Sequence, residues 1–184
     1  MQIMDSPARY GAVSRIFHWG IAALLIWQLA GMLSKVTLGR DAALTGFIAG
    51  SHQSLGFVLF VLVVLRVIWA LLNISRRPAH EVGLMGMAAK AGHVAMYALM
   101  VLVPGIALIR AWGNERAYDV FGWNLFPARA EGEAVQWAVT LGGDWHGELA
   151  WVLGALILGH VVMAVWHTAV RRDGTLERMA GSAA

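Results

Sequence analysis

Two of the seven histidines, His146 and His160, lie 14 residues apart in one apolar stretch of the chain. In an α-helix this interval completes four turns less about 40°, and it carries the second side chain about 21 Å along the axis. Both imidazoles therefore leave the same face of the helix at two different depths. Such a helix could hold two metal-containing groups, one above the other, because neutral imidazole is a common metal ligand.

The composition is that of an integral membrane protein. The chain has 59% hydrophobic residues, 14% charged residues and a mean hydropathy of +0.63, far from the balance of a soluble domain. It has no cysteine, which excludes disulfides, iron–sulfur clusters, thiolate ligation and covalently attached haem. The pI of about 9.8 could suggest nucleic acid. The 14 Lys and Arg lie mostly at the ends of apolar runs, however, which favours a bilayer surface and no nucleic acid.

Four apolar segments approach or exceed the length needed to cross a bilayer, at about 15–34, 52–72, 90–110 and 146–169. The first resembles a signal peptide but lacks a clear small-residue cleavage site, so we expect it to be retained. No pattern between the segments suggests a second domain. Residues 1–184 are therefore expected to form one all-α domain, a bundle of four transmembrane helices.

The basic residues predict how the bundle is oriented. With four spans both termini lie on one side, here called side A, together with the loop between the second and third spans; the other side is side B. Side A carries Arg9, Arg15, Arg76, Arg77, Lys90, Arg171, Arg172 and Arg178, against Lys35, Arg40, Arg110, Arg116 and Arg129 on side B. Side A is therefore expected to be cytoplasmic. The long aromatic loop 111–145 is expected to lie on the periplasmic membrane surface, as a short cap or an interfacial helix.

Depth in the bilayer predicts how the histidines pair. Because successive spans run in opposite directions, His52 and His146 fall toward side B, whereas His18 and His160 fall toward side A. Each pair could supply both axial nitrogens of a b-type haem held between helices, an arrangement suited to electron transfer. His93 also falls toward side A, and depth alone would let it replace His18 or His160.

The chain resembles the bacterial cytochrome b561 family of small four-helix di-haem proteins, related to cytochrome b subunits of nickel–iron hydrogenase and formate dehydrogenase. The resemblance covers roughly residues 9–179. Its motifs are Arg15-Ile-Phe-His18-Trp19, His52-Gln-Ser-Leu-Gly56 with Leu65-Arg66, Gly92-His93 through Tyr97 ahead of Pro104-Gly105, and His146-Gly-Glu-Leu-Ala through His160 and His167 to Met179.

This resemblance implies that the first, second and fourth helices supply the ligands, which selects His18, His52, His146 and His160. It places His93 beside a haem ligand or on the quinone side. It implies two haem b groups in the bacterial inner membrane. It also implies electron exchange between a donor and ubiquinone, with superoxide as a possible donor. The activity expected is that of a superoxide:ubiquinone oxidoreductase.

Two further residues acquire expected roles. Arg66 is the one fixed charge in the apolar run Val61–Leu72 and lies 14 residues after His52, so it is expected to face inward and neutralise a haem propionate. Its alternative is to snorkel toward side A. His167 lies seven positions beyond His160, on nearly the same face about 10 Å closer to side A. It could bond or protonate a quinone there, or simply reach water.

The donor is the least determined part of this hypothesis. An anion such as superoxide should be drawn by positive potential, yet side B carries five basic against seven acidic residues: Asp41, Glu115, Asp119, Glu131, Glu133, Asp144 and Glu148. The alternative function is a membrane anchor or electron-carrier subunit of a hydrogenase or dehydrogenase complex. The sequence fits a monomer, a homodimer or a subunit equally well.

Overall fold

Four long helices dominate the computed structural model, which describes residues 2–78 and 82–181. They are α1 (Ala12–Thr37), α2 (Ala43–Leu72), α3 (Leu84–Gly113) and α4 (Gln136–Trp166), and α4 continues into the π-helix η2 (His167–Arg171). All four are long and apolar enough to cross a membrane. The prediction of an all-α bundle of four spans is confirmed.

The helices are longer than the apolar cores from which they were predicted. The largest difference is in α4, which begins at Gln136 rather than near residue 146. Polar residues such as Asp144 and His146 lie inside this helix, and hydropathy alone cannot place a helix end within a polar stretch. The connection between α3 and α4 is accordingly shorter than the predicted loop 111–145.

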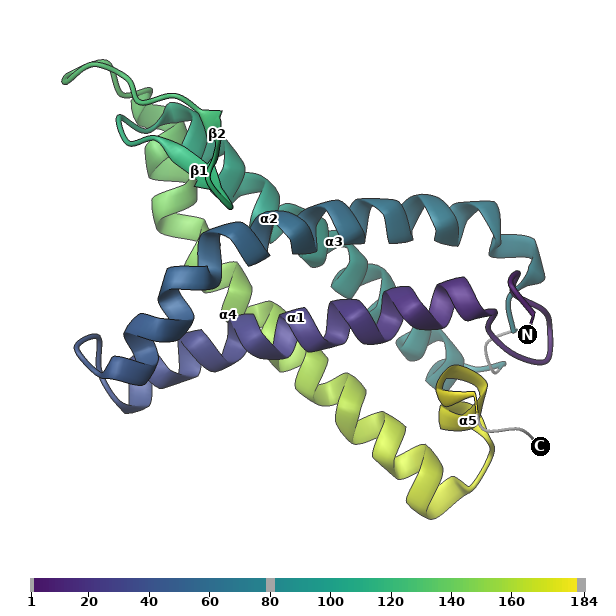
Figure 1. The fold of residues 1–184 in the computed structure, drawn as a ribbon. Helices are drawn as coiled ribbons and strands as arrows, with labels where there is room; N and C mark the ends of the chain where they lie inside the picture. The colour runs from purple at the N-terminus through teal and green to yellow at the C-terminus, as the bar shows by residue number, and fades with distance from the viewer. Residues whose placement is uncertain (1, 79–81, 182–184) are drawn as a thin grey trace.

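The helices pack as two antiparallel pairs. α1 packs against α2, α3 packs against α4, and α2 joins the pairs through its contact with α3. In Figure 1, α4 passes behind α1. The buried centre, formed by Ile21, Leu59 and Val63, lies where α1, α2 and α3 meet, while most other apolar side chains face outward, as expected in lipid.

Small residues let α3 and α4 approach closely. A side-chain carbon at Gly142 would collide with Cβ of Arg110 and lie 2.9 Å from the Ile106 carbonyl oxygen. At Gly113 it would lie 2.7 Å from Cβ of Ala138. Close backbone contact between small residues is a common way to hold membrane helices together. This contact fixes α4 one turn before His146.

Side B is covered by a β-hairpin rather than an interfacial helix. β1 (Tyr118–Val120) pairs antiparallel with β2 (Trp123–Phe126), and the turn between them has positive φ at Phe121 (49°) and Gly122 (86°). Such a two-residue turn matches the twist of paired strands. The hairpin lies near the side-B ends of α3 and α4 (Figure 1).

The two ends of the chain meet on side A. The buried Asp5 carboxylate pairs with Arg77 Nε at 3.1 Å, which ties the N-terminal segment to the segment after α2. The short helix α5 (Thr175–Ala180) folds back beside the start of α1 (Figure 1), and its Arg178 carbonyl accepts a hydrogen bond from the Tyr10 amide at 3.2 Å. Burial raises the pKa of Tyr10. Side A is therefore closed by both termini.

Candidate functional site: two histidine clusters

Three histidines converge toward side A. His18 of α1 and His160 of α4 have ring centres 6.2 Å apart with planes at 72°. His93 of α3 also lies beside His160, at 5.4 Å. The Nδ1 atom of His93 faces the Ala89 carbonyl oxygen at 2.7 Å, and since a carbonyl only accepts, this nitrogen is the donor. The structure thus brings together all three residues that depth had placed here.

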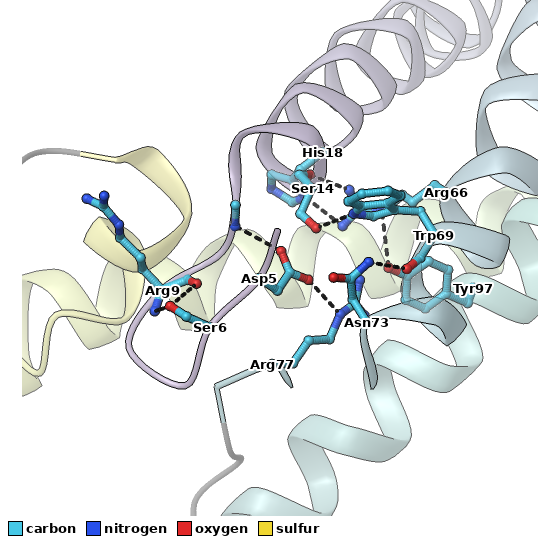
Figure 2. A network of polar contacts seen from close by, with 11 residues as sticks. Asp5, Ser6, Arg9, Ser14, His18, Arg66, Trp69, Asn73, Arg77 and Tyr97 are labelled. Carbon is cyan, nitrogen blue, oxygen red and sulfur yellow. Dashed lines mark hydrogen bonds and ion pairs between the residues drawn. The ribbon is translucent and has the colours of Figure 1, made fainter. Parts of the chain in front are cut away.

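Arg66 points inward beside His18, one residue of this cluster (Figure 2). Its Nε donates to Tyr97 Oη at 3.1 Å, its Nη1 donates to the Ser14 carbonyl at 3.0 Å, and its Nη2 lies 3.5 Å from His18 Nδ1. Trp69 Nε1 donates to Ser14 Oγ at 2.9 Å and so supports the same arrangement. The guanidinium is held inward by neutral groups. Within the described residues no carboxylate forms an ion pair with it.

His167 lies at the side-A end of α4, where the helix widens into η2. Its Nδ1 lies 2.6 Å from Asp173 Oδ2, and its side chain is 18% exposed. The α-helix continues from His160 to Trp166, directly before His167, so seven residues return this ring to nearly the face of His160, about 10 Å nearer side A. The pair formed by the Asp173 carboxylate and the His167 imidazole therefore lies between the three-histidine cluster and the side-A surface.

The second cluster lies toward side B, between α2 and α4. The ring centres of His52 and His146 are 6.0 Å apart and their planes are nearly perpendicular, at 88°. His146 Nδ1 donates to the Val103 carbonyl at 3.0 Å, which leaves Nε2 with the lone pair in the neutral ring. Gln28 Nε2 donates to the His52 carbonyl at 3.2 Å, and Gln28 Oε1 is a buried acceptor that has no hydrogen-bond partner in the described part of the chain.

The hairpin is bonded to α2 directly after His52. Gln53 Nε2 donates to the Asp119 carbonyl at 2.7 Å, and Tyr118 Oη donates back to the Gln53 carbonyl at 3.1 Å. The amide of Phe121, at the hairpin tip, donates to Ser54 Oγ at 3.2 Å. The tip of the hairpin is thereby fixed next to the helical turn that carries His52.

A basic hollow lies beside the hairpin on side B. The Arg129 guanidinium carbon lies 5.0 Å from the centre of the Trp112 ring, and Arg129 Nε donates to the Trp112 carbonyl at 3.1 Å. These residues and the segment 126–128 line a hollow of about 200 Å³. A guanidinium stacked on an indole keeps its charge at the surface of this hollow.

Sequence reasoning placed the six membrane histidines by depth, but it missed several of their partners. Trp69, which had no assigned part, bonds to a buried serine next to Arg66. Tyr97, Asp173 and the hairpin had no assigned part. The available signal was helical spacing: Tyr97 lies four residues after His93, on the same face of α3.

Apolar spanning helices with histidines paired between them are typical of a membrane cytochrome, and comparison with known proteins shows this class. The model of the family described as prokaryotic cytochrome b561 matches residues 9–182. Cytochrome b561 homolog 2 of Escherichia coli (strain K12) is 31% identical over 182 residues, covering 98% of this chain and 96% of that protein. The chain belongs to the prokaryotic cytochrome b561 family.

Membership has direct consequences for class and cofactor. The protein is a multi-pass membrane protein that transfers electrons, and its cofactor is haem b. Without cysteine, the chain must hold this cofactor without a thioether bond. Imidazole is the ligand that the two clusters offer.

Proposed function

We propose that the protein binds two haem b groups, one through His52 and His146 and one through His18 and His160, and carries electrons from a periplasmic donor to ubiquinone. The observation that carries this proposal is that the two pairs have nearly equal ring separations, 6.0 and 6.2 Å, toward opposite ends of the bundle. Haem with two imidazole ligands supplies a one-electron couple with no open position for oxygen chemistry.

The separations agree with the size of a coordination sphere. A metal lies about 2 Å from each imidazole nitrogen, and each nitrogen lies about 1 Å from its ring centre, so two axial rings on one line have centres about 6 Å apart. Their planes can take any angle about that line, including the observed 72° and 88°. His93 and His160, at 5.4 Å, are too close for this arrangement. We therefore assign His18, and not His93, as the partner of His160, with His93 as a neighbour of this pair.

Hydrogen bonds orient the proposed ligands. The Val103 carbonyl fixes His146 with its proton on Nδ1, as is usual for a metal-bound imidazole. His18 differs, because Arg66 can only donate to its Nδ1. If His18 bound a metal through Nε2, its proton would lie on Nδ1, and this N–H would face the N–H groups of the Arg66 guanidinium. Arg66 would then turn to another acceptor, and a haem propionate is the anion expected at this depth.

The ubiquinone site is assigned to side A, near His167 and His93. His167 follows the side-A pair along one face of α4 and is partly exposed. Imidazole can both bond a quinone carbonyl and exchange protons near neutral pH. Reduction of a quinone needs two electrons and two protons, so a titratable group is required where the electrons leave.

The donor site is assigned to side B, and superoxide is the proposed donor. The hollow with Arg129 and Trp112 adds a fixed positive charge close to the hairpin, against an overall excess of acidic residues on that side. A local cationic site can attract a small anion even where the total charge is unfavourable. Side A is taken as cytoplasmic and the membrane as the bacterial inner membrane, from the distribution of basic residues.

The alternative, an electron-carrier subunit for a separate dehydrogenase, is favoured by one observation. Phe121 and Trp123 of the hairpin are 67% and 83% exposed, next to the turn that follows His52. Exposed aromatic side chains near an electron entry point could bind a protein partner.

Purified protein tests these assignments. Haem extraction should give about two haem b per chain, as two bis-histidine pairs require. A superoxide source should then drive steady ubiquinone reduction by the purified protein. If superoxide drives no ubiquinone reduction and a redox enzyme co-purifies with the protein, the function as an electron-carrier subunit is favoured. A content of about one haem per chain would contradict the two paired sites.

A further inference from the structure

The chain makes an unusual reversal at the end of α4. The Arg172 amide donates to the His167 carbonyl at 2.7 Å, which closes the wide turn of the π-helix. Arg172 (φ 53°) and Gly174 (φ 73°) then take left-handed conformations. This reversal brings the carboxylate of Asp173 back to the ring of His167, although Asp173 lies beyond the end of the helix.

The two oxygens of Asp173 have separate partners. Oδ2 lies 2.6 Å from His167 Nδ1, while Oδ1 accepts from Thr175 Oγ1 at 2.6 Å and from the Thr175 amide at 3.1 Å. The hydrogen bonds from Thr175, followed by that from His167, hold the pKa of Asp173 well below its usual value. Asp173 is therefore ionised at neutral pH and fixed in position.

We propose that Asp173 is a positioning residue that prepares His167 to deliver protons to a quinone on side A; this rests on the quinone site proposed above. A carboxylate only accepts, so the His167 proton lies on Nδ1 and Nε2 is the nitrogen that exchanges protons. His167 thus becomes a proton donor through Nε2 only when it is charged.

Water on side A is the only further reactant that the proton balance needs. For each electron that reaches the quinone, Nε2–H of charged His167 gives one proton to a carbonyl oxygen, and water on side A restores it. The side chains of His167 and Asp173 are 18% and 25% exposed, so both reach the surface. Arg171 Nε lies 3.5 Å from the same carboxylate, and α5 carries the titratable residues Glu177 and Arg178 against η2.

Asp173→Asn tests the proposal in the haem-loaded protein. The amide can keep the Thr175 bonds through Oδ1, but its Nδ2 donates to His167 Nδ1 and the charge is lost. We expect kcat for ubiquinone reduction to fall about tenfold or more, with KM within about twofold, since proton delivery is impaired and binding is not. The alkaline limb of the pH–rate profile should move to lower pH, because the variant removes the negative charge that contacts the His167 ring.

Thr175→Ala is the matched control. It removes the Oγ1 bond to the same carboxylate but keeps the amide bond at residue 175 and the charge beside His167. It should keep kcat and the pH profile of the wild type. If both variants lose activity alike with no shift of the profile, Asp173 only anchors α5 and the proposal is overturned.

A second readout is independent of turnover. Diethyl pyrocarbonate acylates neutral imidazole, and mass spectrometry can follow its reaction at His167 as a function of pH. The midpoint should move to lower pH in Asp173→Asn and stay in place in Thr175→Ala; an unchanged midpoint would contradict the proposal. If His167→Gln slows quinone reduction and Asp173→Asn does not, only this inference fails. Wild-type activity of His167→Gln would overturn the quinone site as well.

Discussion

Arg66 is the residue whose chemistry is most constrained by its surroundings. Its charge lies within a membrane span, held by Tyr97 and the Ser14 carbonyl and close to His18. A charge in this position is costly, so such residues are usually paired and usually serve a function. Its inward orientation matches the expectation from sequence and argues against snorkelling.

Arg66→Gln should lower the midpoint potential of the side-A haem, because a nearby positive charge favours the reduced form. The shift is expected to be on the order of 60 mV, a tenfold change in a one-electron equilibrium. A redox titration followed by absorbance measures it. Arg40→Gln, on an exposed side-B residue, is the control and should leave both potentials in place. Equal small shifts in the two variants would contradict the role of Arg66.

Asp5 ties the N-terminal segment to the rest of side A. Its buried carboxylate accepts from the Gly11 amide at 2.8 Å and pairs with Arg77. Asp5→Asn should destabilise the protein by about 1–3 kcal/mol, because a buried charged partner is lost. Thermal unfolding in detergent measures this, with exposed Asp41→Asn as the control. Indistinguishable melting of the two variants would show that this ion pair adds nothing.

At the scale of elements, the α3–α4 contact fixes one wall of the side-B site. The contact depends on Gly142, which meets Arg110 and the Ile106 carbonyl, whereas the next residue, Gly143, has open space around it. Two adjacent glycines on one helix thus differ in what a methyl group would meet.

Gly142→Ala should cost about 1–3 kcal/mol of stability through overpacking, whereas Gly143→Ala should be neutral or slightly stabilising. Thermal unfolding in the same detergent compares the two. Equal stability of both variants would mean that α3 and α4 do not approach as closely as described.

The histidine depths and the four helices could be predicted because hydropathy and helical spacing are strong local signals. The hairpin could not, since its turn uses Phe121 at positive φ, which that residue rarely adopts. The pairing of His167 with Asp173 depends on a π-helix and two left-handed residues, which spacing does not reveal. Depth could not separate His93 from His18, because both lie toward side A, and the proposed choice of His18 depends on ring distances that the sequence does not contain.

For the whole molecule, the proposed electron path requires both termini in the cytoplasm and the hairpin in the periplasm. The absence of cysteine makes this easy to test. Ala8→Cys and Ala130→Cys place single thiols at exposed positions on sides A and B. A membrane-impermeant maleimide should label only Ala130→Cys in cells with a permeabilised outer membrane, and both after lysis. If only Ala8→Cys is labelled before lysis, the orientation of the protein in the membrane is the opposite of the one proposed.

In the proposed electron path, each of the two histidine pairs holds one haem. The most direct measurement is the haem-to-protein ratio of purified single variants. His146→Ala, His160→Ala, His52→Ala and His18→Ala should each fall from about two haems per chain to about one, while His93→Ala should keep about two. Loss of one haem in His93→Ala together with full retention in His18→Ala would contradict the pairing.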